Sequence, residues 1–226
     1  MDKKIFKRIG LLVPSSNTML EPDFYKNVSE NITIHTARMF LEETTVEGES
    51  KMLDEYLIPA ATSLATAKPD VIVFGCTSAG ALRGNSYDKE LVASISNLTG
   101  IHCISVIKSV REALNKYNAK NIVVATPYVE ELNERIRLSL EEDGVNILNI
   151  AGLGISDNFQ IARVSKPDII DLAKKSISNL SPDLLFLSCT NFPAMSILDE
   201  LRNSFTFPVI SSNQVALDAA ISYLST

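Results

Sequence analysis

Two cysteines of the sequence lie in the same local pattern, and a pair of thiols could perform acid–base or nucleophilic chemistry. Cys76 lies in the segment DVIVFGCTSAG (70–80), and Cys189 lies in DLLFLSCTNFP (183–193). In each segment a short apolar run comes before the cysteine, and a threonine and a small polar residue follow it. Two thiols on opposite faces of one small molecule could act as base and acid, or as nucleophile and proton donor.

A constant offset relates the two segments. Cys189 follows Cys76 by 113 residues (189 − 76), the same offset relates Pro127 to Pro14, and the chain of 226 residues is twice that length. We interpret the offset as an internal duplication, which would place two equivalent strand ends across a pseudo-twofold axis with one thiol on each side of a central cleft. The alternative is that both cysteines are small buried hydrophobic residues, as free cysteines usually are.

The apolar runs before the cysteines predict the elements that position them. Residues 71–74 and 184–187 are unbroken apolar runs, which are typical of strands buried on both faces of a parallel sheet. Ligands of such sheets bind beyond the carboxyl ends of the strands. Further strands are expected at 8–13, 32–38, 102–106, 121–125, 145–151 and 208–211, with helices between them.

This alternation predicts an α/β protein of two Rossmann-like lobes, each a parallel sheet flanked by helices, with the active site in the cleft between them. The first lobe is expected to comprise residues 1–108 together with a C-terminal helix at 212–226, which would pack back on it. Residues 109–211 would form the second lobe.

Composition excludes several classes of function. The net charge is −6 and no long basic run occurs, so no nucleic-acid partner is expected. The first apolar run, residues 9–13, is too short for a signal peptide or a membrane span, which predicts a cytoplasmic protein without a membrane partner. Three cysteines without a C-x-x-C pair predict neither a disulfide framework nor a metal site, and no nucleotide-binding glycine motif occurs. We therefore expect no cofactor.

Polar residues follow two of the predicted strands at the same edge as the cysteines. The loop after the first strand holds Pro14, Ser16 and Asn17, and it offers hydroxyl, amide and backbone donors suited to a carboxylate. The alternative is a capping loop for the next helix. Tyr128 follows the equivalent strand of the second half, where its phenol would point into the cleft or simply pack.

Two further segments could cover the cleft. Residues 40–50, FLEETTVEGES, are polar and acidic and come before a long helix that is expected to run to about residue 67. They could close over a ligand or form an ordinary connection. Residues 152–158, GLGISDN, follow another strand and are expected to be flexible.

Five motifs together resemble the aspartate/glutamate racemase superfamily, and within it the branch of maleate cis-trans isomerases and arylmalonate decarboxylases. They are VPSSNT (13–18), GCTS (75–78), TPY (126–128), DN (157–158) and SCTN (188–191). The resemblance implies two Rossmann-like lobes, a site between them without cofactor or metal, a small carboxylate substrate and a homodimer. Arylmalonate decarboxylases have glycine in place of the first cysteine, so Cys76 favours an isomerase.

The resemblance also implies roles for particular residues. Cys76 and Cys189 would be catalytic, with Cys76 adding to an alkene carbon and Cys189 donating a proton. The expected substrate-binding residues are Pro14, Ser16, Asn17, Thr77, Ser78, Tyr128, Asn158 and Thr190. A free thiol has a pKa of about 8.5, so we expect the pKa of at least one cysteine to be lowered by helix N-termini and nearby donors.

The preferred function is cofactor-independent isomerisation of a small dicarboxylate, most like the conversion of maleate to fumarate. The alternatives are an amino-acid (aspartate or glutamate) or hydantoin racemase that uses the same thiols, and then a decarboxylase of a disubstituted malonate. A non-catalytic protein that binds a small anion is the alternative from another class.

Overall fold

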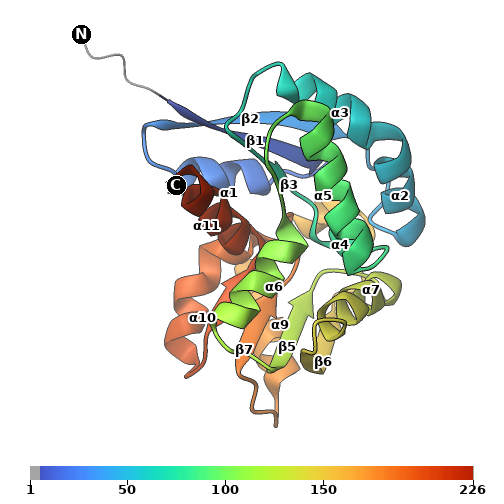
Figure 1. The fold of residues 1–226 in the computed structure, drawn as a ribbon. Coiled ribbons are helices and arrows are strands. Elements are labelled where there is room, and N and C mark those ends of the chain that lie inside the picture. The colour runs from blue at the N-terminus through green and yellow to red at the C-terminus, as the bar shows by residue number, and fades with distance from the viewer. Residues whose placement is uncertain (1–5, 226) are drawn as a thin grey trace.

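The computed structural model describes residues 6–225, which form two four-stranded sheets (Figure 1). The first sheet has the strand order β2-β1-β3-β4 and the second has the order β6-β5-β7-β8. The strands are β1 (Lys7–Pro14), β2 (Ile32–Met39), β3 (Val71–Phe74), β4 (Cys103–Ser105), β5 (Asn121–Thr126), β6 (Asn146–Gly152), β7 (Leu184–Leu187) and β8 (Val209–Ser211). All neighbouring strands pair in parallel.

The two sheets are equivalent, because adding four to each strand number of the first order gives the second. Cys76 follows β3, and Cys189 follows the equivalent strand β7. The predicted α/β fold of two Rossmann-like halves is therefore confirmed. Since all strands of a parallel sheet end at one edge, each sheet delivers its loop residues to a common site.

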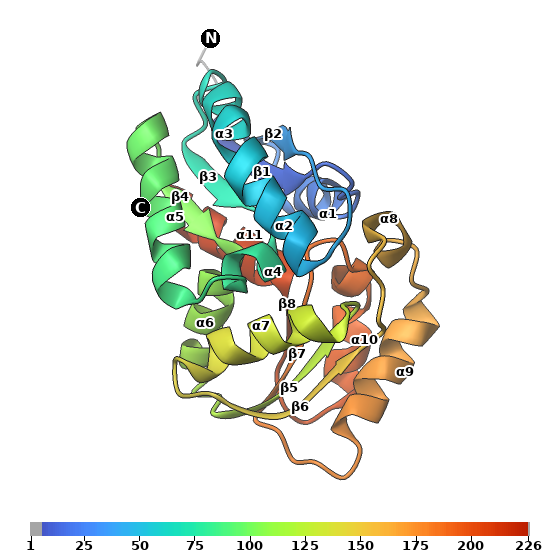
Figure 2. The ribbon, with the colours of Figure 1, turned by 90° about the vertical axis from the view of Figure 1, so that its right-hand side faces the viewer.

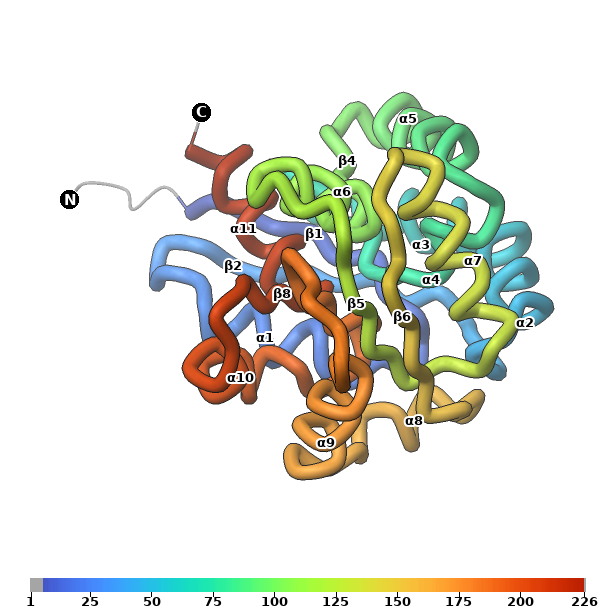
Figure 3. Tube along the Cα trace, turned by 90° about the horizontal axis from the view of Figure 1, so that it is seen from below, coloured from blue at the N-terminus to red at the C-terminus, as the bar shows by residue number. Residues whose placement is uncertain are grey.

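Helices connect the strands and cover the sheets. They are α1 (Leu20–Asn27), α2 (Val46–Lys51), α3 (Leu57–Ala65), α4 (Thr77–Ala81), α5 (Asn85–Thr99), α6 (Val106–Lys116), α7 (Glu130–Glu141), α8 (Asn158–Ile161), α9 (Lys166–Ile177), α10 (Leu198–Ser204) and α11 (Ser212–Leu224). A π-helical segment η1 (Met52–Tyr56) joins α2 to α3, and a 3-10 segment η2 (Pro193–Ile197) comes before α10. Figures 2 and 3 show α7 on one side of the second sheet and α9 and α10 on the other.

Alternate residues of the first sheet face two different layers of helices. Leu11 and Val73 belong to one hydrophobic cluster with Phe24 of α1, whereas Leu12 and Ile72 belong to another that includes residues of α3 and α5. Burial on both faces explains why the strands read as continuous apolar runs in the sequence.

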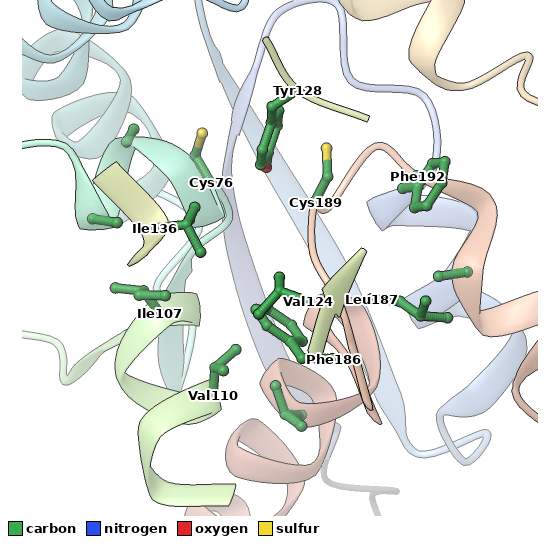
Figure 4. Packing of buried hydrophobic residues seen from close by; sticks show 14 of the residues in the cluster. Cys76, Ile107, Val110, Val124, Tyr128, Ile136, Phe186, Leu187, Cys189 and Phe192 are labelled. Atoms are coloured by element: carbon green, nitrogen blue, oxygen red, sulfur yellow. The ribbon is translucent and has the colours of Figure 1, made fainter. Parts of the chain in front are cut away.

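Two helices are exchanged between the halves. Helix α11 follows the second sheet but contacts β3 and α1 of the first half, as expected for the last helix. Helix α6 follows the first sheet, yet its Ile107 and Val110 share a hydrophobic cluster with Val124 and Phe186 of the second sheet (Figure 4). The predicted lobe boundary between residues 108 and 109 falls within α6, and the division into lobes remains a proposal.

Three segments differ from the sequence prediction. Residues 46–51 already form α2, so the stretch 40–50 is only in part a loop. Residues 77–81 form the short helix α4, which the sequence analysis did not assign. Residues 158–161 form α8 at the end of the segment that was expected to be flexible. Each of these helices has only one or two turns, which is too short to give a helical pattern in the sequence. Side chains of Thr45 and Asp157 cap α2 and α8, and α4, which has no such cap, is buried.

Candidate active site

The two cysteines meet at one small cavity at the carboxyl ends of β3 and β7. Each cysteine is 5% exposed. Figure 4 shows the two sulfur atoms with the Tyr128 side chain between them. The cavity admits the centre of a water molecule over about 10 Å³, which is room for about one water. It is lined by Pro14, Asn17, Leu41, Thr44, Glu49, Cys76, Ser78, Tyr128, Asn158, Cys189, Thr190 and Asn191.

Most of the residues that the sequence predicted for the site line this cavity, and two do not. Thr77 is buried, and its hydroxyl donates a hydrogen bond to Ser212 Oγ at 2.9 Å. Ser16 Oγ accepts a hydrogen bond from Asn158 Nδ2 at 2.9 Å. Both side chains therefore support neighbours of the cavity and do not line it.

Asn17 stabilises the turn before α1 and also lines the cavity. Its Oδ1 accepts hydrogen bonds from the backbone N–H groups of Met19 and Leu20, each at 3.0 Å, which stabilises the turn before α1. Its Nδ2 donates to Thr190 Oγ1 at 3.0 Å. The turn therefore fixes an amide group at the cavity wall.

Asn191 is a site residue that the sequence analysis did not single out. Its Nδ2 donates to the backbone oxygen of Asn158 at 2.6 Å and to Asn158 Oδ1 at 3.1 Å. Its Oδ1 accepts from the backbone N–H of Thr18 at 2.8 Å. Asn191 thus joins the Pro14–Thr18 loop to α8, and its place directly after Cys189-Thr190 could have identified it.

Cys189 has an unusual backbone and several donors around its sulfur. Its φ is 110°, a region in which residues other than glycine are strained, and such strain often occurs at functional sites. The backbone N–H of Asn191 lies 3.3 Å from Cys189 Sγ. Burial raises the pKa of Cys189 to about 11, although hydrogen bonds from Tyr128 and Asn191 oppose this shift.

Cys76 faces a carboxyl group that the sequence analysis missed. The thiol lies 3.9 Å from Glu49 Oε1, and the Ser78 hydroxyl donates to the same oxygen. Glu49 is completely buried, and burial raises its pKa from the usual 4.5 to about 8. Burial, followed by the charge of Glu49, raises the pKa of Cys76 well above its ordinary value.

Neither thiol is therefore activated by its surroundings alone. The expectation that a helix N-terminus and nearby donors lower the pKa of at least one cysteine is wrong, because burial raises the pKa of both. The physical reason is that the loss of water around a buried thiolate outweighs the few hydrogen bonds that it receives.

The segment 40–51 covers the cavity, and its residues Leu41, Thr44 and Glu49 line it. The backbone N–H of Thr44 donates to the Ser156 oxygen at 2.8 Å, and that of Val46 donates to Glu131 Oε1 at 3.0 Å. The N–H of Leu41 donates to Ser15 Oγ at 3.0 Å. These bonds tie the segment to both halves, so a ligand larger than water requires the segment to move.

Two polar atoms at the cavity have no hydrogen-bond partner among residues 6–225. They are Glu49 Oε2 and Thr44 Oγ1, both of which are buried. Buried polar atoms are nearly always paired in folded proteins. Unpaired polar atoms at a cavity are expected where a polar ligand binds.

A family model described as arylmalonate decarboxylase matches residues 9–226. The chain belongs to this family. Among its relatives, the maleate isomerase of Geobacillus stearothermophilus is 25% identical over 218 residues, covering 91% of this chain and 86% of that protein. The arylmalonate decarboxylase of Bordetella bronchiseptica is 24% identical over 207 residues, with 91% and 85% covered. The predicted resemblance to this branch is confirmed.

Solved structures of the family share the fold. One is a cysteine-to-serine mutant of the Nocardia farcinica maleate cis-trans isomerase with a covalently bound succinylcysteine intermediate. It superposes on this chain with a TM-score of 0.90 at 23% identity, and the match covers 97% of this chain and 93% of that chain. A crystal structure of arylmalonate decarboxylase superposes with a TM-score of 0.79 at 21% identity, with 96% and 92% covered. At these identities the likeness establishes the fold alone.

Residues 6–225 contain neither a metal-binding cluster nor a membrane-spanning helix. No group of three or more His, Cys, Asp or Glu side chains in this range could hold a metal ion. No helix in this range is both long and apolar enough to cross a membrane.

Proposed function

We propose that the protein is a cofactor-independent cis-trans isomerase of a small dicarboxylate, most like maleate isomerase. The observation that carries the proposal is the pair of thiols, placed by equivalent strands on one enclosed cavity. Relatives named maleate isomerase support it, and so does the related enzyme whose structure holds a succinylcysteine, which is the product of thiol addition to the alkene.

The chemistry needs both thiols. Once Cys76 has lost its S–H proton, its sulfur bonds to one alkene carbon and the Cys189 thiol gives its proton to the other, so that the double bond becomes a single bond. Rotation about this bond brings the two carboxylates to the trans arrangement. Cys189 then takes a proton back from the same carbon, the C–S bond breaks, and the trans alkene leaves.

Neutral donors would hold the carboxylates. Amide and hydroxyl groups of Asn17, Ser78, Tyr128, Asn158 and Thr190 line the cavity, and no Lys, Arg or His is among its lining residues. Pro14 would form an apolar part of the wall, while Ser16 and Thr77 position their neighbours. Donors that are fixed before the reaction stabilise the enolate-like charge that develops on a carboxylate next to the reacting carbon.

Proton NMR in deuterated water tests the proposal. With maleate, the protein is expected to produce the fumarate signal without added metal or nucleotide. Aspartate, glutamate, a hydantoin and phenylmalonate serve as alternative substrates in the same assay. Exchange of an α-proton in the amino acids or the hydantoin, with no conversion of maleate, would establish a racemase, and loss of carbon dioxide from phenylmalonate would establish a decarboxylase.

The proposal includes a homodimer in the cytoplasm. It rests on the resemblance to the superfamily. Light scattering coupled to size-exclusion chromatography measures the oligomeric state directly.

A further inference from the structure

Glu49 lies where it can exchange a proton with Cys76. We propose that Glu49 is a catalytic base, which takes the thiol proton of Cys76 as the sulfur adds to the substrate and returns it when the product leaves. The role in turnover rests on the proposed function, but the proton transfer itself can be tested without any substrate.

The geometry supports a direct transfer. Cys76 donates its thiol hydrogen to Glu49 Oε1 across 3.9 Å, and Ser78 Oγ donates to the same oxygen and lies 3.9 Å from the sulfur. Thr45 Oγ1 accepts from the backbone N–H of Gly48 at 3.1 Å and so fixes the first turn of α2, on which Glu49 stands. In the closed site the acceptor oxygen therefore lies next to the thiol.

The surroundings of Cys76 create a need for such a base. Burial keeps the thiol protonated, and the protonated form is a poor nucleophile. Tyr128 also stays protonated, because burial and the nearby sulfur atoms raise its pKa well above the usual value. Glu49 is the carboxyl group among the residues that line the cavity, and a base is most effective when its pKa lies near the working pH.

The free oxygen of Glu49 favours a functional role over a purely structural one. A carboxyl group kept only for structure would have hydrogen bonds to both oxygens, because a buried oxygen without a partner loses its hydrogen bonds to water and gains none in return. Glu49 Oε1 has two donors, whereas Oε2 has none and belongs to a residue that lines the cavity.

The charged and titratable groups around Glu49 are Cys76, Cys189, Tyr128 and Glu131. Glu131 accepts a hydrogen bond from Val46 at the start of α2, and its negative charge makes ionisation of Glu49 harder. Transfer of the proton from Cys76 to Glu49 moves one negative charge from oxygen to sulfur and then into the substrate, without creating a second buried charge.

Each proton that moves during one turnover returns to its original residue. The Cys76 S–H bond breaks and Glu49 gains that proton, the sulfur bonds to an alkene carbon, and the other carbon gains the proton of Cys189, which becomes a thiolate. After rotation, Cys189 regains its proton from carbon and the C–S bond breaks. The departing Cys76 sulfur regains its proton from Glu49, so both residues return to their starting states.

The test measures the rate at which iodoacetamide, an uncharged reagent, alkylates Cys76 at pH values from 6 to 9. Peptide mapping identifies which cysteine is labelled. Glu49→Gln keeps the size of the side chain and removes the base. We expect it to slow alkylation of Cys76 at pH 7.5 at least about tenfold, and we expect Glu49→Asp to lie between Gln and the native protein. Glu47→Gln changes the same charge at an exposed position of α2 and should leave the rate unchanged.

Cys189 lines the same cavity and is alkylated in the same sample, so it reports access to the cavity. Because the charge of Glu49 also raises the pKa of Cys189, loss of that charge alone should speed the alkylation of Cys189. The native protein gives a second measurement that needs no variant: its Cys76 rate should rise with an inflection near pH 8, the pKa of Glu49.

A higher alkylation rate of Cys76 in Glu49→Gln would overturn the proposal. If Glu49 acted only through its charge, its removal would favour the thiolate and Cys76 would react faster in Glu49→Gln. A faster or unchanged alkylation rate of Cys76 in Glu49→Gln, or an inflection of the native rate above pH 9, rejects the base role. Slower labelling in a protein that does not convert maleate would reject the proposed function and leave the base role standing.

Discussion

The Thr190 hydroxyl donates a hydrogen bond to the backbone oxygen of Gly75 at 3.0 Å, and it accepts one from Asn17 Nδ2 at 3.0 Å. The first bond joins the residue after Cys189 to the residue before Cys76, and the second joins the same hydroxyl to the loop after β1. The relative position of the two thiols is therefore fixed by a buried hydroxyl between the halves.

Thr190→Val should remove both bonds while keeping the shape of the side chain. It leaves a buried carbonyl and a buried amide unpaired, so we expect the free energy of unfolding to fall by about 1–3 kcal/mol and activity to fall with it. Chemical denaturation measures the first effect. Thr190→Ser keeps the hydroxyl and should retain most of the stability, so equal losses in both variants would show that the methyl group matters instead.

Gly48→Ala tests the placement of α2. Alanine normally stabilises a helix relative to glycine by about 1 kcal/mol. At this position, however, a Cβ atom would lie 2.2 Å from the backbone oxygen of Glu43, so the helix has to shift. We expect lower kcat and slower alkylation of Cys76, and a variant as active as the native protein would show that the position of Glu49 does not matter.

Glu49 should also make stability depend on pH. Its pKa is about 8 in the folded protein and close to 4.5 when unfolded, so the folded state holds the proton more tightly. Stability from this group is present below about pH 4.5 and is lost as the pH rises toward 8.

The measurement is the difference in unfolding free energy between native protein and Glu49→Gln at several pH values. Native protein should lose stability relative to the variant between pH 5 and 8. Asp23 and Asp88, whose pKa values are also raised by burial, are common to both proteins and cancel in the difference. A difference that does not change with pH would contradict the raised pKa of Glu49.

Asn158→Asp tests the carboxylate-binding role of the amides. Asn158 is buried, lines the cavity and is held by Asn191 and Ser16. A carboxylate there would repel an anionic substrate, so we expect KM to rise about tenfold or more. Asn203→Asp, at an exposed position of α10, should leave KM unchanged. An unaltered KM in Asn158→Asp would remove this residue from the binding site.

Much of the fold could be predicted from the sequence because the duplication is visible in it. The offset of 113 residues between Cys76 and Cys189 corresponds to the equivalence of β3 and β7, and the buried strands appear as apolar runs. The exchange of α6 and α11 between the halves is harder to infer, because a helix that covers a neighbouring sheet has the same apolar pattern as one that covers its own.

Glu49 could not be predicted in the same way. It stands in an acidic segment, and acidic segments are usually exposed loops. One pattern did mark it: Val46, Met52 and Leu53 lie three or four residues away on the same helical face, and Met52 and Leu53 are buried. A carboxyl group on the apolar side of an amphipathic helix indicates a candidate site residue.

The most direct test of the central claim is intact-protein mass spectrometry of two variants after incubation with maleate. Cys189→Ser keeps the nucleophile and loses an efficient proton donor, so it should accumulate the mass of one substrate on Cys76 and turn over poorly. Cys76→Ser should show no added mass. An adduct on Cys76→Ser, or full activity in either variant, would contradict addition through Cys76 with proton transfer by Cys189.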